Sequence, residues 1–281
     1  MRIANLSGRP ALVVDGRAID IEQASDGRFS ADPQALYERW EEFRTWAATA
    51  ADLPEGVAFD PADLGSPAPA PRQTFAIGLN YRDHAAESGF AVPEGLPPVF
   101  TKFVTSLSGP VTDVRLPAGG NTDWEVELVV VVGRLAEEVS EQNAWAHVAG
   151  LTVGQDISER VSQLAGPVPQ FSLGKSYPGF TPMGPWLVTP DEFDNPDDLE
   201  LRCAVNGEEV QKGRTRDLIF SVPALISKLS AVLPLLPGDL IFTGTPAGVG
   251  LGRDPQRWLA PGDELVSGIE GIGELRQTFV G

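Results

Sequence analysis

The sequence has 281 residues, of which 42% are hydrophobic, so the chain can bury a sizeable core in one large domain or in a main domain with a small one. Its formal net charge of −18 creates a surface that repels phosphate backbones and anionic lipid, and we expect neither nucleic acid nor a membrane as a partner. Cys203 is the only cysteine, which excludes an intrachain disulfide, and its apolar neighbours predict a buried thiol rather than a nucleophile. The N-terminus has no long apolar segment of the secretory type, so we expect a cytoplasmic protein.

The first 50 residues predict a hairpin followed by a helix. Residues 11–14 and 17–21 alternate like paired strands on either side of Asp15-Gly16, which is a favoured hairpin turn. Asp32-Pro33 is a typical helix start, and apolar residues at helical spacing continue from there to about Ala50.

A proline-rich stretch then separates this part from the rest of the chain. Prolines crowd residues 52–72, and this composition resists regular structure and suits an extended linker. We therefore expect a small N-terminal α/β module with its linker at residues 1–70 and a main domain at residues 71–281. The module carries no chemical signature that indicates a function of its own.

Strand patterns dominate after residue 74. Residues 125–132 contain a continuous valine run that is typical of a buried strand, and Asn206-Gly207 is a hairpin signal. Strands and helices do not alternate regularly, so we expect a mixed, mainly antiparallel sheet with a few helices rather than a doubly wound parallel sheet. Further strands are predicted at 75–79, 150–155, 199–205 and 240–243, and short helices at 140–148 and 222–229.

Three carboxylates are candidates for metal ligands. Glu125 and Glu127 alternate on a predicted strand and therefore point to one face, either on a solvent-facing edge or buried and in need of a cation. Asp156 ends an apolar strand, either as the N-cap of a short helix or as a third ligand. Three carboxylates without a paired His or Cys favour a hard cation, and Mg²⁺ or Mn²⁺ would suit them, as would Ca²⁺.

The histidines are the next candidates for catalytic groups. His84 and Glu87 are three residues apart on a short helical stretch, where they would meet on one face, as a surface pair or as an oriented base. The residues that follow, from Gly89 to Pro98, are rich in Gly and Pro, which indicates a mobile lid. His147 lies on a predicted helix and is expected to be structural.

Two further segments are candidates for contact with an anion. Lys175 follows an apolar segment, although a lone lysine is usually just solvated. Residues 243–250 contain glycines that let backbone N–H groups approach a ligand closely. This segment lacks the Gly-Lys-Ser/Thr ending of a P-loop and the strand–helix context of a Rossmann fold.

Seven short segments stand in order between about residues 74 and 280. They are GLNYRDH (78–84), DWEVEL (123–128), GQDISER (154–160), GKSY (174–177), PMGP (182–185), NGE (206–208) and TGTPAGVG (243–250). Taken together, they resemble the fumarylacetoacetate hydrolase family. The resemblance implies an α+β, mainly β fold in which a mixed β-roll follows a small N-terminal domain, and it implies a homodimer.

The same resemblance implies roles for single residues. It makes His84 and Glu87 the dyad that activates water in the family's hydrolases, and it places Lys175 near the substrate and the metal. The divalent-metal ligands are implied to be Glu125, Glu127 and Asp156. The implied substrate-binding residues are Arg82, Arg160, Gln163, Gly244 and Thr245, with Thr245 contacting the substrate carboxylate.

Two positions depart from the family pattern. Val161 stands where many members have Asp after the arginine, and Tyr-Pro-Gly at 177–179 replaces the frequent Phe-Asp. Both changes are expected to reshape the pocket, which affects the substrate more than the metal.

These residues together predict a metal-dependent enzyme that acts on a small anionic 2-oxo acid. A 2,4-dioxo acid of the acylpyruvate type could chelate the metal, while water activated by His84 attacks the distal carbonyl and pyruvate leaves. The same site would suit decarboxylation of oxaloacetate, or isomerisation or dehydration of a 2-oxo acid. A non-catalytic small-molecule binder is the alternative from a different class.

Overall fold

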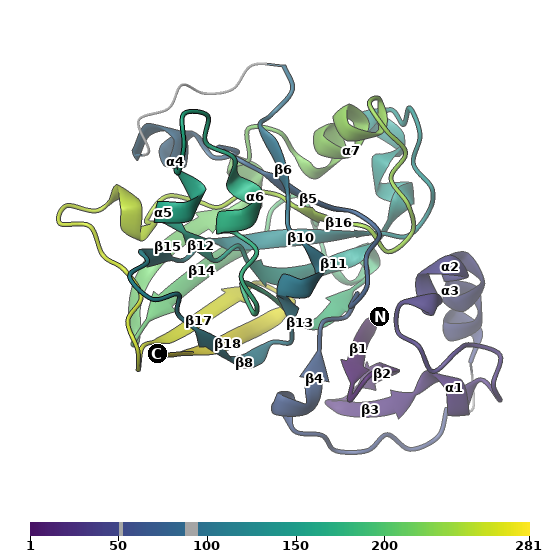
Figure 1. Cartoon of the computed structure of the whole chain (residues 1–281). Helices are drawn as coiled ribbons and strands as arrows, with labels where there is room; N and C mark the ends of the chain where they lie inside the picture. The colour runs from purple at the N-terminus through teal and green to yellow at the C-terminus, as the bar shows by residue number, and fades with distance from the viewer. Residues whose placement is uncertain (51–52, 88–94) are drawn as a thin grey trace.

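The structure of this chain is a computed structural model that describes residues 1–50, 53–87 and 95–281 (Figure 1). Strands dominate it and helices are few and short, which confirms the predicted mixed, mainly antiparallel sheet fold. The strands of the larger sheet, in spatial order, are β3 (Arg17–Asp20), β2 (Arg9–Val14), β1 (Arg2–Leu6), β13 (Thr181–Val188), β11 (Val148–Gln155), β10 (Val126–Val132), β16 (Leu240–Phe242), β5 (Thr74–Ile77) and β6 (Val99–Thr101), with β4 (Leu64–Gly65) beside β1 and β7 (Leu107–Ser108) beside β13.

A second sheet packs against the larger one. Its strands are β15 (Glu208–Arg214), β14 (Glu200–Val205), β17 (Glu264–Ile269), β18 (Gly273–Val280) and β8 (Val111–Arg115), and the short strands β9 (Thr122–Asp123) and β12 (Ser158–Glu159) pair separately. The predicted hairpin turns are confirmed, since both Asp15-Gly16 and Asn206-Gly207 have positive φ at each residue and connect antiparallel strands. Of the strand pairs that the structure describes, β16 with β5, β13 with β7 and β18 with β8 are parallel.

The central strand β10 is buried on both faces. Val126 and Leu128 pack in a core cluster shared with the second sheet, whereas Val129 and Val131 pack in a cluster shared with the N-terminal helices. Burial on both faces explains the continuous valine run. Because side chains alternate along a strand, Glu127 shares the face of Val129 and Val131.

The helices are short and lie at the margins of the sheets (Figure 1). The helix predicted at 32–50 is two helices that meet at Arg39, whose φ of −124° is not helical; the rings of Tyr37 and Trp40 stack across this break at 5.6 Å. In the described ranges, no helix is long and apolar enough to cross a membrane. The α-helices are α1 (Ile21–Ala24), α2 (Ala35–Glu38), α3 (Trp40–Thr49), α4 (Arg82–Glu87), α5 (Arg160–Gln163), α6 (Phe171–Gly174) and α7 (Val222–Ser230), and the 3₁₀ helices are η1 (Pro61–Asp63), η2 (Val104–Ser106), η3 (Glu141–His147), η4 (Pro190–Glu192), η5 (Thr215–Asp217) and η6 (Gly250–Gly252).

The N-terminal residues continue the main sheet. Strand β1 pairs with β13, where Ile3 lies opposite Leu187, and the aromatic residues Trp40 and Phe43 share one core cluster with Val131. Both the larger sheet and this core cluster contain residues from before and after position 70. The domain boundary that the sequence predicts at residue 70 stays a prediction.

Candidate functional site

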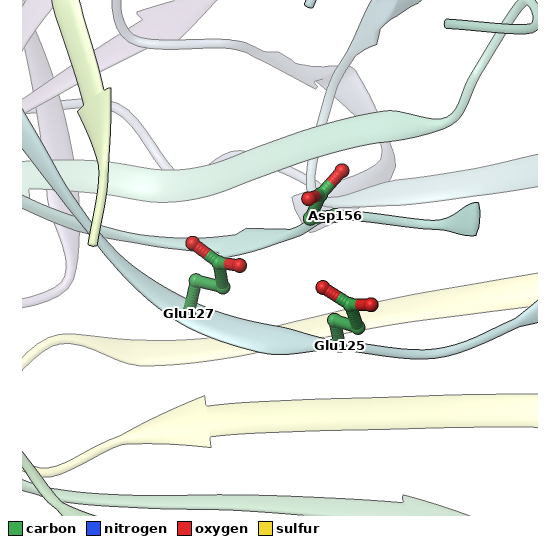
Figure 2. Close-up of side chains that lie close together, drawn as sticks. All are labelled: Glu125, Glu127 and Asp156. Carbon is green, nitrogen blue, oxygen red and sulfur yellow. The ribbon is translucent and has the colours of Figure 1, made fainter. Parts of the chain in front are cut away.

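Three buried carboxylates meet where β10 begins and β11 ends. Glu125 and Glu127 point to one side of their strand, toward Asp156 (Figure 2). Oxygen atoms of the three groups lie within 4.8 Å of one another, and no side chain of the three is more than about one twentieth exposed. The pair is therefore not a solvent-facing edge. Asp156 is not a helix N-cap either, because Glu159 caps α5 instead.

Two buried lysines hold Asp156. Lys175 Nζ lies 2.5 Å from Asp156 Oδ2 and 2.8 Å from Glu125 Oε2. Lys102 Nζ lies 2.5 Å from Asp156 Oδ1 and also donates to the backbone carbonyls of Lys175 and Phe180. Burial lowers the pKa of Lys175, but the negative charges of Asp156 and Glu125 outweigh this effect, so that the pKa is raised. Sequence reasoning missed Lys102, whose only local signal is its alternation with Phe100 at a strand end.

Glu127 is the carboxylate without a charge partner. Its Oε2 accepts the backbone N–H of Gly244 at 2.7 Å, and it makes no ion pair within the described part of the chain. Burial and the neighbouring Asp156 and Glu125 raise the pKa of Glu127 well above its usual range. By contrast, burial raises the pKa of Glu125, but the positive charges of Lys175 and Arg160 outweigh this effect and lower the pKa to about 2. An all-oxygen donor set with one uncompensated buried carboxylate fits Mg²⁺ or Mn²⁺.

Arg160 is committed to holding other residues of the site. Its Nε and Nη2 donate to Asp123 Oδ2, at 2.9 and 2.6 Å, and its Nη1 lies 2.8 Å from both Glu125 Oε1 and Gln163 Oε1. Asp123, the last residue of β9, also accepts the N–H of Gly250, which ties the glycine-rich segment to β9. Asp123 was given no role from sequence, yet its alternation with Glu125 and Glu127 was the available signal.

His84 and Glu87 meet on α4. His84 Nδ1 lies 2.8 Å from Glu87 Oε1, and Glu87 Oε2 accepts the N–H of Gly248 at 2.9 Å. With the Nδ1–H tautomer, which this contact favours, Nε2 of His84 is left to accept a proton. Of the predicted lid, Gly89 and Pro93 lie outside the described residues.

Gly244 and Thr245 brace the start of β10. The Thr245 hydroxyl donates to Val126 O at 2.9 Å and accepts from Gln211 Nε2 at 2.8 Å, so its single proton is already used. Gln211 Oε1 in turn accepts the N–H of Val126. Nothing in the local sequence distinguishes Gln211 from any polar residue on a strand, and it was missed.

A pocket of about 50 Å³ opens above these groups, and His84, Glu125, Arg160, Gln163, Lys175 and Thr245 contribute its polar lining. Arg82 does not line it; it is exposed and faces a separate cleft with Lys212 and Arg216. Neither Val161 nor residues 177–179, which depart from the family pattern, line the pocket. Val161 is 55% exposed, and the hydroxyl of Tyr177 lies 2.9 Å from Ser162 Oγ.

Cys203 and His147 are structural, as expected. Cys203 is buried, and burial raises the pKa of its thiol to about 12, which leaves no reactive thiolate. His147 Nδ1 lies 2.9 Å from the carbonyl oxygen of Leu135, away from the carboxylates.

Comparison with known proteins places this geometry in context. The 2,4-didehydro-3-deoxy-L-rhamnonate hydrolase of Sphingomonas sp. (strain SKA58) is 48% identical over 72% of this chain and 71% of its own, and the human mitochondrial oxaloacetate tautomerase FAHD2A is 42% identical over 76% and 68%. A solved structure from Mycobacterium smegmatis has a TM-score of 0.95 at 57% identity, covering 100% of this chain and 99% of its own. Maleylpyruvate hydrolase from Sphingobium sp. SYK-6, solved with manganese(II) and pyruvate, has a TM-score of 0.80 at 31% identity, covering 100% and 99%.

The family model described as fumarylacetoacetate (FAA) hydrolase C-terminal matches residues 73–280, which is most of the chain and includes every residue of the site described above. The named relatives include hydrolases and a tautomerase, and one of the solved structures holds a divalent metal. The chain belongs to the fumarylacetoacetate hydrolase family.

Proposed function

We propose that this chain is a divalent-metal-dependent hydrolase that cleaves a C–C bond in a 2,4-dioxo acid of the acylpyruvate type and releases pyruvate. One observation carries the proposal: His84, oriented by Glu87, lines the same pocket as Lys175 and as Glu125, which is one of the three clustered carboxylates. The relative solved with manganese(II) and pyruvate supports both the metal and the 2-oxo acid.

The inner end of the pocket would bind the 2-oxo acid part of the substrate. A Mg²⁺ or Mn²⁺ ion held by Glu125, Glu127 and Asp156 would supply Lewis-acid polarisation of the carboxylate and 2-oxo oxygens. Gln163 uses its Oε1 for Arg160, which leaves its Nε2–H donors for the substrate. The ammonium of Lys175 would stabilise negative charge that develops on the 2-oxo oxygen, and one such donor is worth about 3 kcal/mol.

His84 would act as the base. Its Nε2 would take a proton from a water that attacks C4, and the charge of Glu87 would stabilise the resulting imidazolium. When the C3–C4 bond breaks, its electron pair moves to C3 and the pyruvate part leaves as an enolate. The imidazolium can then return its proton to C3, so that the products are pyruvate and the second carboxylic acid.

The test is a panel of 2-oxo acids assayed with Mg²⁺ and Mn²⁺ in water enriched in ¹⁸O, with mass spectrometry of the products. Hydrolysis predicts pyruvate together with a second acid that carries one ¹⁸O atom from the solvent. Formation of carbon dioxide without that acid would overturn the proposal in favour of decarboxylation. A metal-loaded protein that is inert to every acylpyruvate and to oxaloacetate would indicate a binder.

A second candidate is tautomerisation of oxaloacetate, which the human relative favours, or decarboxylation of oxaloacetate. This chemistry uses the same carboxylates and Lys175 but needs no attacking water. Loss of activity toward acylpyruvates with retained turnover of oxaloacetate in His84→Ala would show that the two reactions divide at the base.

A further inference from the structure

We infer that the outer part of this pocket selects substrates whose acyl group is uncharged and apolar, and that it discriminates against substrates ending in a second carboxylate. The inference rests on the proposed function, because it assumes that the 2-oxo acid end lies against the carboxylate cluster. It concerns the residues between that cluster and the mouth of the pocket.

An aromatic wall leads outward from Lys175. The Lys175 ammonium lies 4.9 Å from the centre of the Phe100 ring, and the Phe100 ring lies 5.6 Å from that of Phe171 in an edge-to-face arrangement. Phe100 is buried and Phe171 is only partly buried, so the wall passes from the charged inner end toward solvent. An acyl chain placed along it would contact carbon atoms.

The remaining outer lining is also apolar. Leu164 is 44% exposed at the mouth, and the other residues of this lining are Ile77, Gly78, Leu79 and Leu251. Leu79 has a φ of 57°, which a bulky residue rarely adopts. The side chain of Asn80 secures this corner, because it donates to two backbone carbonyls and accepts the N–H of Phe220.

The outer pocket offers no uncommitted cation among the described residues. The basic residues that line the pocket are His84, Arg160 and Lys175, and each already pairs with one or two carboxylates. Residues 88–94 lie outside the described part, and their sequence, SGFAVPE, contains no Lys, Arg or His. A second carboxylate at the far end of a substrate would therefore lose water without gaining a partner, which is unfavourable.

The first test measures binding of a matched pair of ligands to the Mn²⁺-loaded protein by calorimetry. The pair is 2-oxohexanoate and 2-oxoadipate, which differ only by a terminal methyl or carboxylate, with oxalate as a reference for the inner end. We expect 2-oxohexanoate to bind at least tenfold more tightly than 2-oxoadipate, and the 2-oxo acid shorter than 2-oxohexanoate by one methylene to bind about fourfold more weakly. Equal or tighter binding of 2-oxoadipate would overturn the inference, as would binding of oxalate without either longer ligand.

The second test adds a cation to the mouth. Leu164→Arg should improve the affinity for 2-oxoadipate relative to 2-oxohexanoate at least tenfold, because the new guanidinium would pair with the distal carboxylate. Val161→Arg is the matched control, since it adds the same charge on the adjoining α5 without lining the pocket. It should leave the ratio within twofold. Equal shifts in both variants would trace discrimination to the overall charge and contradict a local apolar wall.

Hydrolysis of 2,4-dioxooctanoate and 2,4-dioxooctanedioate separates this inference from the proposed function. If both substrates are cleaved with equal kcat/KM, the function stands and the inference fails. If neither is cleaved but 2-oxohexanoate still binds more tightly than 2-oxoadipate, the hydrolase proposal fails and the selectivity of the wall stands.

Discussion

The two ends of the pocket differ in burial, in charge and in the elements that carry them. At the inner end, charged side chains come mainly from the ends of β10 and β11, and Glu125, Glu127, Asp156, Lys102 and Lys175 are all buried. The mouth is formed in part by the region of the short helices α5 and α6 (Figure 1). Leu164 follows α5 and Phe171 begins α6, and both side chains are partly exposed. The inner side chains are held by charge pairs and hydrogen bonds, whereas the outer side chains are apolar and make only apolar contacts themselves.

This difference implies unequal tolerance of substitution. Removing one member of a buried ion pair leaves its partner as an unpaired buried charge and lowers the stability of the fold by several kcal/mol. Removing a partly exposed apolar side chain lowers it far less. We therefore expect changes at the inner end to abolish chemistry or folding, and changes at the mouth to alter which substrate is accepted.

The largest effect is expected for Asp156→Ala. It removes the shared partner of Lys102 and Lys175, so the free energy of unfolding of the metal-free protein should fall by about 3–5 kcal/mol, and turnover should be lost. Urea denaturation of the metal-free protein measures the change in stability, and a turnover assay with added Mn²⁺, run beside the wild type, measures the loss of activity. An unfolding midpoint equal to that of the wild type would contradict the proposed ion-pair network.

Glu127→Gln is the matched variant, because it removes a ligand charge without breaking an ion pair. Stability of the metal-free protein should be unchanged or higher, since repulsion from Asp156 and Glu125 is relieved. Mn²⁺ affinity should fall by about a hundredfold, and turnover should fall at least as much. Wild-type turnover of this variant at limiting Mn²⁺ would refute the metal site.

His84→Ala is expected to have the next largest effect on turnover. The loss of the base should lower kcat by about 10²–10⁴-fold, while Mn²⁺ affinity stays within a few fold of the wild type, because the hydrogen bond of the His84 side chain goes to Glu87 and not to a carboxylate of the cluster. Glu87→Gln should cause a smaller loss, since the imidazole keeps a hydrogen-bond acceptor. Unchanged hydrolysis by His84→Ala would remove it from the role of base.

Mn²⁺ affinity should depend on pH through Glu127. Burial and two neighbouring carboxylates raise the pKa of Glu127, so a proton occupies it at a higher pH than usual and competes with the metal. The apparent affinity should therefore fall as the pH falls below this raised pKa, by up to about tenfold per pH unit. In Glu127→Gln the dependence of Mn²⁺ affinity on pH should be shallower than in the wild type. An unchanged slope would show that the proton that competes with the metal binds to another group.

The smallest effect is expected at the mouth, for Phe171→Ala. It shortens the aromatic wall, so kcat/KM should fall by about fivefold for a substrate with a four-carbon alkyl chain and by less than twofold for acetylpyruvate. Leu173→Ala is the control on the same helix, because Leu173 is 72% exposed and does not line the pocket. Equal losses on both substrates would show that Phe171 acts at the inner end.

Part of this site followed from local geometry. Strand alternation predicted that Glu125 and Glu127 share a face, and three-residue spacing predicted that His84 meets Glu87. The approach of Asp156 depends on a strand pairing, in which Val126 lies opposite Gln155. Lys102 belongs to neither strand, so no spacing along the chain could connect it with the carboxylates.

The tertiary structure also changed how single residues are used. The backbone N–H of Gly244 donates to Glu127, and the hydroxyl of Thr245 donates to the carbonyl oxygen of Val126. The guanidinium of Arg160 pairs with carboxylates of its own chain. Arg82 faces another cleft. Each had been assigned to the substrate by resemblance, and that assignment stays a prediction.

By itself, the sequence determined the donor chemistry of this protein, an acidic oxygen set with a histidine–glutamate pair, because residue type and short spacing are local properties of the chain. Only the tertiary structure decided which carboxylate lacks a charge partner and where the pocket turns from charged to apolar. Both depend on burial and on distances between segments that are far apart in the sequence, such as Lys102, Asp156 and Phe171.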